Sequence, residues 1–453
     1  MKKENRISKE IGATGQRKTP FDHSRRDALK KLGLTAAAVA GPLIVPSRLV
    51  AQKTAKSTTP PPSERINVGL IGVGGAMNET MRKLLTRDDV FIKATCDVDE
   101  RRYKAALVDI KRAYWKFKAE FGDGLGTQDH REIIANDDID AVVIATPVHW
   151  HAAIALDAIR AGKDVLIQSP MTLTVREGQL VEEAARNHGA IAQCIAPMRC
   201  KDDVVKACGL VRNGYLGQIK EVYVARSPFP ESNSLPAQEP PKELDYDRWL
   251  GPAPVVPYHS SRVNGSRVGG WRSFWDYGVR THGEPGFDRY DVIQWALGME
   301  NTGPIEFTPA GVDDQEYATY RYANGTTVKI GHPVSTSNEI EFVGAEASIS
   351  IADRGSLNTE PRELSRTNLT VGDTRLPLEH VVEDSWIENI KARTKPIVDA
   401  SVAHRTTSIC LLNAIAERTE RKLTWDPEKQ EITDNPGASR MLDRPRRAPY
   451  TLV

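Results

Sequence analysis

The chain has 453 residues, of which 61 are Lys or Arg and 60 are Asp or Glu, so its formal net charge is +1. This balance excludes the strong basic field of a protein that wraps nucleic acid. A hydrophobic content of 40% excludes disorder throughout the chain, and a chain of this length is expected to form roughly two or three globular domains.

The first 62 residues differ from the rest in charge. They carry 13 Lys or Arg and 4 acidic residues, a local charge of +9, whereas the other 391 residues carry −8. The pair Arg25-Arg26 precedes an uncharged, mostly apolar stretch over 32–47, which is too short for a helix of about 20 residues that spans a bilayer. A basic region followed by a short apolar region is typical of an export signal, and the arginine pair resembles a twin-arginine signal.

We therefore expect an export signal over residues 1–51 and a polar linker over residues 52–64. This interpretation implies the twin-arginine export machinery as a partner and a periplasmic or secreted location. An uncleaved N-terminal anchor is the alternative. The five cysteines are odd in number and lack the spacing of metal ligands, so the sequence predicts neither a disulfide framework nor a metal site.

A dinucleotide-binding pattern opens the globular part. An apolar run over 66–71 predicts a strand, and it ends at a turn that contains Gly72, Gly74 and Gly75, after which residues 79–85 predict a helix. Such a turn lets the backbone approach a pyrophosphate, and the helix N-terminus offers N–H donors to it. The third glycine position of the usual fingerprint is occupied by Met77, so the fingerprint is partial.

Further strands are predicted over 90–96, 141–145 and 164–167, with a helix over 152–161. This alternation predicts a doubly wound parallel sheet, in which ligands bind at the carboxyl ends of the strands. Asp97 stands at such an end and is expected to meet the ribose of NAD, although Arg101 and Arg102 leave NADP possible. The other expected cofactor contacts at strand ends are Thr146, Pro147, His149, His151 and Gln168. The alternatives are that Asp97 caps a helix or lies at the surface, and that both histidines simply line a loop.

Several segments together resemble the Gfo/Idh/MocA oxidoreductase family, and its secreted bacterial branch in particular. The first group comprises residues 68–75, 96–99, 145–151 and 168–170, and the second comprises residues 271–278, 294–298, 403–405, 423–427 and 444–449. The resemblance covers roughly residues 65 to 453. It implies a Rossmann domain, assigned to 65–192, and an α/β domain with an open, mostly antiparallel sheet, assigned to 193–380. Residues 381–453 are expected to form a helical segment and an arm that pack back on the body.

The second domain also has a pattern of its own. Residues 220–226, 339–343 and 347–351 predict strands, and residues 317–330 predict a hairpin that turns at Asn324-Gly325. A proline-rich excursion over 235–258 is expected to form a pocket rim or to cover the surface. In the family this sheet often mediates assembly, so the resemblance implies a homo-oligomer.

The family's usual acid/base residues are changed in this chain. The family has a lysine in an E-K-P motif and a D-x-x-x-H pair, and the matching positions here are Ser169, Glu284 and Asp288. On one helix face Glu284 and Asp288 would lie an i, i+4 step apart, where two like charges raise one pKa. A solvated acidic rim is the alternative. His282 and His149 are further candidate proton acceptors, and Trp271, Phe274, Trp275 and Tyr277 are candidates either for stacking on a sugar or for the core.

Three functions remain open from the sequence. The first is an NAD(P)-dependent oxidoreductase that acts on a sugar, cyclitol or glycoside in the periplasm, with altered or weak catalysis. The second keeps the dinucleotide site but is a glycoside lyase or hydrolase, or an inactive relative. The third is a carbohydrate-binding protein that needs no cofactor. The acidic balance after the leader favours a neutral sugar over an anionic substrate.

Overall fold

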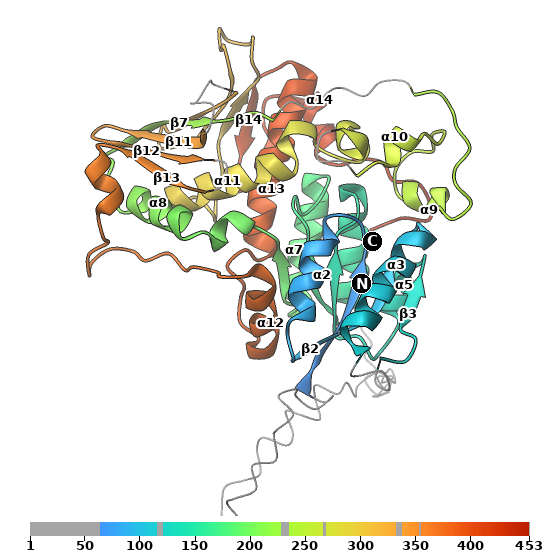
Figure 1. Cartoon of the computed structure of the whole chain (residues 1–453). Helices are drawn as coiled ribbons and strands as arrows, with labels where there is room; N and C mark the ends of the chain where they lie inside the picture. The colour runs from blue at the N-terminus through green and yellow to red at the C-terminus, as the bar shows by residue number, and fades with distance from the viewer. Residues whose placement is uncertain are drawn as a thin grey trace, which may run out of the picture. The chain divides into compact units, whose positions relative to one another are not determined.

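A six-stranded parallel sheet forms the first half of the computed structural model, which describes residues 64–115, 121–227, 235–265, 269–331, 338–352 and 355–452 (Figure 1). Its strands lie in the order β3-β2-β1-β4-β5-β6. Their bounds are β1 Ile66–Ile71, β2 Val90–Cys96, β3 Leu125–Thr127, β4 Ala141–Ile144, β5 Asp164–Ile167 and β6 Ala192–Cys194. The strands β4, β5 and β6 are buried along their whole length, as expected for a parallel sheet covered on both faces. The strand order reverses between β1 and β4, which places a crevice at their carboxyl ends.

Helices connect these strands: α2 Met77–Leu85, α3 Glu100–Ala113, α5 His130–Ile134, α6 His151–Arg160 and α7 Val175–His188, with the short turn η3 Val148–Trp150 before α6. Their ends follow from the sequence. The side chain of Asp99 caps α3 by accepting a hydrogen bond from the Arg101 N–H, and Thr174 and Glu177 form a capping box on α7. The N-terminus of α2 has no side-chain cap, and its Met77 and Asn78 N–H groups donate to the backbone oxygens of Gly74 and Gly75 at 3.1 and 3.3 Å.

The second half forms a nine-stranded sheet in the order β13-β12-β11-β7-β10-β9-β8-β14-β15. Its strands are β7 Ile219–Val224, β8 Glu306–Thr308, β9 Ala318–Arg321, β10 Thr327–Ile330, β11 Asn338–Gly344, β12 Ser348–Ala352, β13 Leu357–Glu360, β14 Leu423–Asp426 and β15 Glu431–Ile432. All pairings are antiparallel except β7 with β10. The helices α8 Asp202–Arg212, α11 Glu284–Leu297 and α13 Ala400–Thr419 pack against this sheet (Figure 1). The predicted fold class is therefore confirmed.

Shorter elements complete the described chain. They are η4 Pro197–Cys200, α9 Tyr246–Leu250, α10 Ser260–Val263, η5 Gly270–Ser273, η6 Arg280–His282, η7 Arg362–Arg366, α14 Pro436–Ser439 and η8 Arg440–Leu442. One further helix, α12 Val382–Ala392, packs against α2, and Trp386 and Ile387 of α12 lie fully buried in the same apolar cluster as β1 and β2. The Thr80 hydroxyl of α2 donates a hydrogen bond of 2.7 Å to Glu383 of α12. A C-terminal helix thus completes the core of the first domain.

The predicted boundary between residues 192 and 193 falls inside β6, which continues the parallel sheet to Cys194. The expected export signal and linker, apart from Glu64, lie outside the described residues. Among the described helices, none combines the length and apolar character that a membrane crossing requires.

Candidate active site

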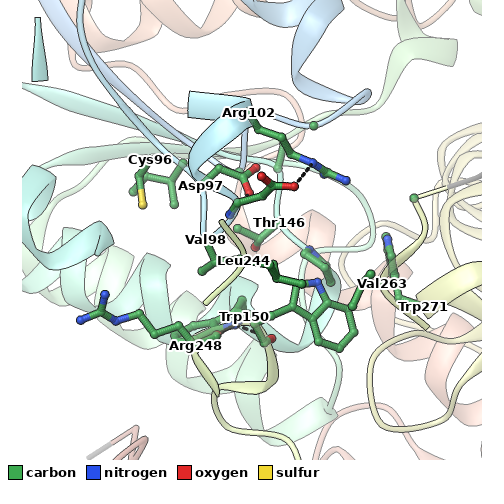
Figure 2. Close-up of a pocket in the computed structure, with 18 of the residues that line it drawn as sticks. Cys96, Asp97, Val98, Arg102, Thr146, Trp150, Leu244, Arg248, Val263 and Trp271 are labelled. Atoms are coloured by element: carbon green, nitrogen blue, oxygen red, sulfur yellow. Dashed lines mark hydrogen bonds and ion pairs between the residues drawn. The ribbon is translucent and has the colours of Figure 1, made fainter. Parts of the chain in front are cut away.

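A cleft opens at the carboxyl ends of β1, β2 and β4 and encloses about 1500 Å³ of space, part of it open to solvent. Residues of both domains line it, among them Gly72, Asp97, Thr146, Gln168, Trp271 and Glu284. Figure 2 shows how Asp97 and Thr146 of the parallel sheet face side chains such as Leu244, Val263 and Trp271 from the second half of the chain. The cleft lies where a doubly wound sheet binds its ligand.

The glycine turn shapes the floor of this cleft. Gly72 has a φ of +82°, and a Cβ atom there would lie 2.7 Å from the Thr146 nitrogen, so no other residue fits without a shift of the backbone. A Cβ atom on Gly75 would meet no atom within 4 Å, which leaves an open cradle in front of the uncapped N-terminus of α2. Backbone donors at a helix N-terminus fit a pyrophosphate.

Asp97 lies at the end of β2 with 8% of its surface exposed. It accepts a hydrogen bond of 3.0 Å from the backbone N–H of Asp99. Burial raises the pKa of Asp97 to about 6, although the positive charge of Arg102 acts in the opposite direction. Asp97 does not cap a helix, because Asp99 caps α3. A buried carboxylate at this strand end suits the hydroxyl groups of a ribose.

The remaining predicted contacts divide into two groups. Thr146, Pro147 and Gln168 line the cleft, and the Thr146 hydroxyl is a buried group with no hydrogen-bond partner among the described residues. The expectation that His149 and His151 face the cofactor is not met, since neither side chain lines the cleft. His151 contacts the backbone oxygens of Thr146 and Pro170, at 2.8 and 3.0 Å, and His149 contacts that of Trp249 at 2.9 Å. Both imidazoles therefore hold loops together.

Of the three altered acid/base positions, only Glu284 lines the cleft. Its two carboxylate oxygens accept hydrogen bonds of 2.8 and 2.7 Å from Nε and Nη2 of Arg272. Glu284 and Asp288 both belong to α11, so the predicted helix is confirmed. Asp288 does not line the cleft, and burial together with the charge of Glu284 raises its pKa to about 8. Ser169 is 5% exposed and does not line the cleft either.

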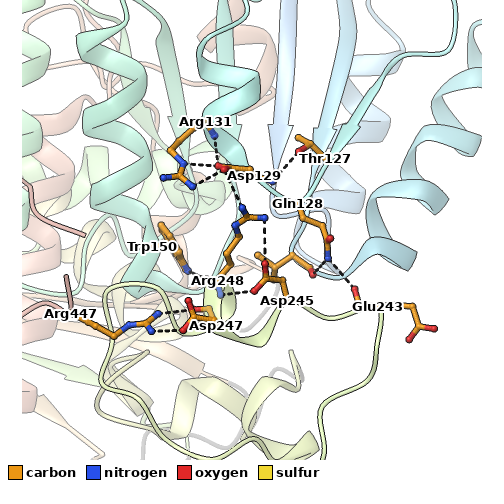
Figure 3. A network of polar contacts seen from close by, with 11 residues as sticks. Thr127, Gln128, Asp129, Arg131, Trp150, Glu243, Asp245, Asp247, Arg248 and Arg447 are labelled. Carbon is orange, nitrogen blue, oxygen red and sulfur yellow. Dashed lines mark hydrogen bonds and ion pairs between the residues drawn. The ribbon is translucent and has the colours of Figure 1, made fainter. Parts of the chain in front are cut away.

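A cover segment, residues 241–265, forms one wall of the cleft through Pro241, Leu244, Arg248, Trp249, Tyr258 and Val263. Backbone bonds fix it to the parallel sheet: the Glu100 N–H donates to Glu243 and the Asp245 N–H donates to Val98, each at 2.9 Å. Figure 3 shows the polar contacts around it, in which Arg248 forms an ion pair of 3.5 Å with Asp129. The proline-rich excursion is thus a pocket rim.

The C-terminal arm also holds the cover segment in place. Arg447 forms an ion pair with Asp247 (Figure 3). Its Nε also donates a hydrogen bond of 2.9 Å to the backbone oxygen of Gly251. Tyr450 lines the cleft and its ring meets that of Trp150 edge to face at 5.2 Å. Sequence reasoning missed Arg248, Arg447 and Tyr450, because their positions depend on contacts between segments about 100 to 300 residues apart. The only signal was the composition of the excursion.

The other residues singled out from the sequence lie in different parts of the structure. Trp271 lines the cleft, and Cζ of Arg272 lies 4.1 Å from the centre of its ring. Phe274 and Tyr277 belong to the apolar core. Trp275 lines a different cavity. His282 is 1% exposed, and its Nδ1 lies 2.7 Å from the hydroxyl of Tyr290, away from the cleft lining. Of the four aromatic residues, only Trp271 remains a candidate to contact a substrate in the cleft.

Comparisons with known families agree with this geometry. Residues 66–195 match a model described as "Oxidoreductase family, NAD-binding Rossmann fold". Residues 220–452 match a second model, "Oxidoreductase family, C-terminal alpha/beta domain". The two models meet at the cleft, and the glycine cradle, Asp97 and the Thr146 hydroxyl fit the NAD that the first description names.

Individual relatives are more distant. The chain is 28% identical over 209 residues to the alpha-N-acetylgalactosaminidase of Shewanella oneidensis, an alignment that covers 43% of this chain and 44% of the relative. The alignments thus span less than half the length of the first curated relatives. Among solved structures, the WlbA dehydrogenase of Bordetella pertussis in complex with NADH and UDP-GlcNAcA is 17% identical, with a TM-score of 0.54 over 80% of this chain and 99% of that one. The scyllo-inositol dehydrogenase of Lactobacillus casei with NAD(H) and scyllo-inositol is 15% identical, with a TM-score of 0.52 over the same shares. These two likenesses establish the fold alone.

Proposed function

The chain belongs to the Gfo/Idh/MocA oxidoreductase family, and on this premise we propose that it is an NAD-dependent enzyme that oxidises or reduces a neutral carbohydrate in the periplasm. The observation that carries the proposal is the joint lining of one cleft by the cofactor cradle around Gly72 and Asp97 and by Glu284 from the second domain. A substrate bound between them would lie next to both. Asp97 in the lining favours NAD, because a carboxylate suits ribose hydroxyl groups and would repel a 2′-phosphate. Arg101 and Arg102 line the same cleft, so NADP is the alternative cofactor.

The residues of the cleft serve cofactor binding, substrate binding and proton transfer. NAD supplies the hydride acceptor or donor when it is bound. The cradle and Asp97 would hold its phosphates and ribose, and Trp271 would offer an aromatic face to a sugar ring. Glu284 accepts the proton of the substrate hydroxyl, and Arg272 fixes the direction of the carboxylate through two hydrogen bonds. Because that pairing competes with proton transfer, we expect turnover to be slow.

The first test is chemical. Purified protein is assayed for bound dinucleotide, and NADH formation is then followed with a panel of sugars, cyclitols and glycosides. Glu284→Gln keeps the size of the side chain and removes its basicity, so kcat should fall about 100-fold while NAD affinity stays unchanged. Asp288→Asn, one helical turn away and outside the cleft lining, is the matched control and should retain activity. Equal activity of wild type and Glu284→Gln would refute the role of Glu284, and a protein that binds no dinucleotide would refute the function.

A second function is favoured by the names of the relatives. Two of them are named glycosyl hydrolase family 109 protein and alpha-N-acetylgalactosaminidase, so a glycoside-cleaving enzyme that uses the same cleft is the alternative. A nitrophenyl α-N-acetylgalactosaminide separates the two functions. Release of nitrophenol without net NADH favours glycoside cleavage, whereas net NADH from a free sugar favours the oxidoreductase.

A further inference from the structure

A second cavity, separate from the cofactor cleft, lies where five segments of the chain meet. It encloses about 570 Å³, part of it open to solvent, and its lining includes His149, Glu177, Ala253, Trp275, Asp276 and Arg444. None of these residues lines the cleft.

His149 presents a hydrogen-bond acceptor in this cavity. Its Nε2 lies 2.9 Å from the backbone oxygen of Trp249, and since a carbonyl only accepts, Nε2 carries the hydrogen. Burial lowers the pKa of His149 to about 4, so the ring is neutral near pH 7 and Nδ1 keeps its lone pair. Nδ1 is buried and has no hydrogen-bond partner among the described residues, on a side chain that is 3% exposed. A buried acceptor of this kind calls for a donor.

Arg444 presents a donor in the same cavity. Its guanidinium lies 3.7 Å above the ring centre of Trp275 and one Nη donates to the Trp275 oxygen. The Nε of Arg444 is buried, with no partner within the described part of the chain. Two residues of the lining therefore carry an unsatisfied acceptor and an unsatisfied donor, both on buried atoms. Asp276 adds a carboxylate to the lining.

The lining of the cavity contains two positively and two negatively charged side chains. Arg444 and Arg446 face Glu177 and Asp276, and Arg446 is already paired with Glu177 at 3.2 Å. An anion without a hydrogen, such as sulfate or chloride, cannot donate to Nδ1 of His149, so it would leave this acceptor unsatisfied. A hydroxyl group both donates and accepts, so a compound with several hydroxyl groups satisfies both side chains at once.

We propose that this cavity is a binding site for a neutral polyhydroxylated ligand, one sugar ring or cyclitol in size. One ligand hydroxyl donates to Nδ1 of His149, and another oxygen accepts from Nε of Arg444. The site is connected to the cofactor cleft through His149, whose Nε2 holds the backbone of Trp249, a residue that lines the cleft. The inference does not depend on the reaction in the cleft.

The experiment uses the NAD-saturated full chain and four probes: N-acetylgalactosamine, galactose, glucose and myo-inositol. Calorimetry measures their affinities, and crystals soaked with each probe locate it. We expect at least one probe to occupy the cavity, with oxygens within hydrogen-bond distance of His149 Nδ1 and Arg444 Nε. Ala253→Met fills the cavity without changing its charge and should weaken this binding at least 10-fold, while NAD affinity stays unchanged.

Two further variants keep the test decisive. Asp276→Asn replaces a lining carboxylate by a group of the same size, and it serves if Ala253→Met lowers the melting temperature too far. Glu284→Gln, in the cleft, should leave the affinity at the second cavity unchanged, so a failure of the proposed reaction does not mimic a failure here. Crystals in which the cavity holds ordered water only, binding seen at crystal concentration only, or equal affinity of wild type, Ala253→Met and Asp276→Asn would overturn the proposal.

Discussion

At the scale of single residues, Asp97 gives the cleft a pH dependence. Its pKa of about 6 in the ligand-free protein means that the carboxyl is largely protonated at pH 5 and ionised at pH 7. A ribose is bound better by the carboxylate, because a charged acceptor makes the stronger hydrogen bonds. NAD affinity should therefore rise roughly tenfold between pH 5 and 7 and then level off. Asp97→Asn should bind NAD about 10–100-fold more weakly and without this pH dependence. Calorimetry at four pH values checks both, and a parallel pH profile in wild type and Asp97→Asn would contradict the assignment.

Asp288 makes the free energy of unfolding, rather than the NAD affinity, depend on pH. Its pKa is raised from 3.8 to about 8, so the folded protein binds this proton more tightly than the unfolded chain does. The resulting stability is fully present below pH 3.8 and is lost as the pH rises through about 8. Asp288→Asn should therefore raise the free energy of unfolding by roughly 4 kcal/mol more at pH 9 than at pH 5. Urea unfolding at both pH values measures this, and a pH-independent difference would show that Asp288 is ionised in the folded protein.

The same scale shows why some site residues could be predicted and others not. Gly72 and Asp97 were located from sequence because their backbone position at a strand end decides what they face. His149 and His151 also follow a strand end, but the turns of η3 and α6 rotate both rings into the protein. A one-residue rotation within a helical turn is not visible in composition or spacing.

At the scale of elements, the cover segment should control how fast the cofactor leaves. Its residues form one wall of the cleft and are fixed to β2, β3 and the C-terminal arm. Arg447→Ala removes the ion pair with Asp247 and the hydrogen bond to Gly251, so the NADH release rate should rise about 10-fold, equivalent to about 1.4 kcal/mol. Stopped-flow fluorescence after mixing with excess NAD measures the rate. Arg440→Ala, at an exposed arginine that does not line the cleft, is the control, and identical rates for both variants would contradict the role of the segment.

Most regular elements were predictable and this segment was not. Four strands of the parallel sheet, β1, β2, β4 and β5, are largely apolar runs and were predicted, whereas β3 and β6, of three residues each, were not. The hairpin turns at Asn324-Gly325 as its sequence predicts. The cover segment contains only the short helices α9 and α10. It is placed by single polar contacts with residues distant in the chain, and such contacts leave no periodic pattern.

At the scale of the whole molecule, the charge asymmetry of the chain supports the proposed export route. The first 62 residues carry +9 and the remaining 391 residues carry −8. If the arginine pair is a twin-arginine signal, replacing Arg25 and Arg26 by Lys should retain most of the protein in the cytoplasm. Fractionation of cells that express wild type or the double variant measures the periplasmic share. Lys2→Arg with Lys3→Arg, which keeps the leader charge and adds no mid-leader pair, is the control. Export of the double-lysine variant at the wild-type level would refute the signal.

The proposed homo-oligomer through the nine-stranded sheet is also a property of the whole molecule, and sedimentation measures it. The outer positions of β7 and β10 carry Glu221, Tyr223 and Lys329. Lys329 forms an ion pair of 2.7 Å with Glu221, and the Tyr223 hydroxyl donates a hydrogen bond to the same carboxylate. An interface there would be polar, so we expect assembly to weaken in high salt.

The packing of α12 has a consequence for the order of folding. Residues 382–390 supply four buried side chains to the apolar cluster that residues 66–191 begin, Val382, Trp386, Ile387 and Ile390. The first domain therefore emerges from the ribosome with part of its core exposed and closes only when nearly the whole chain has been synthesised. Contacts between segments about 300 residues apart make folding slow relative to translation. We therefore expect truncation before residue 382 to leave an NAD-binding half that exposes part of its apolar core and aggregates.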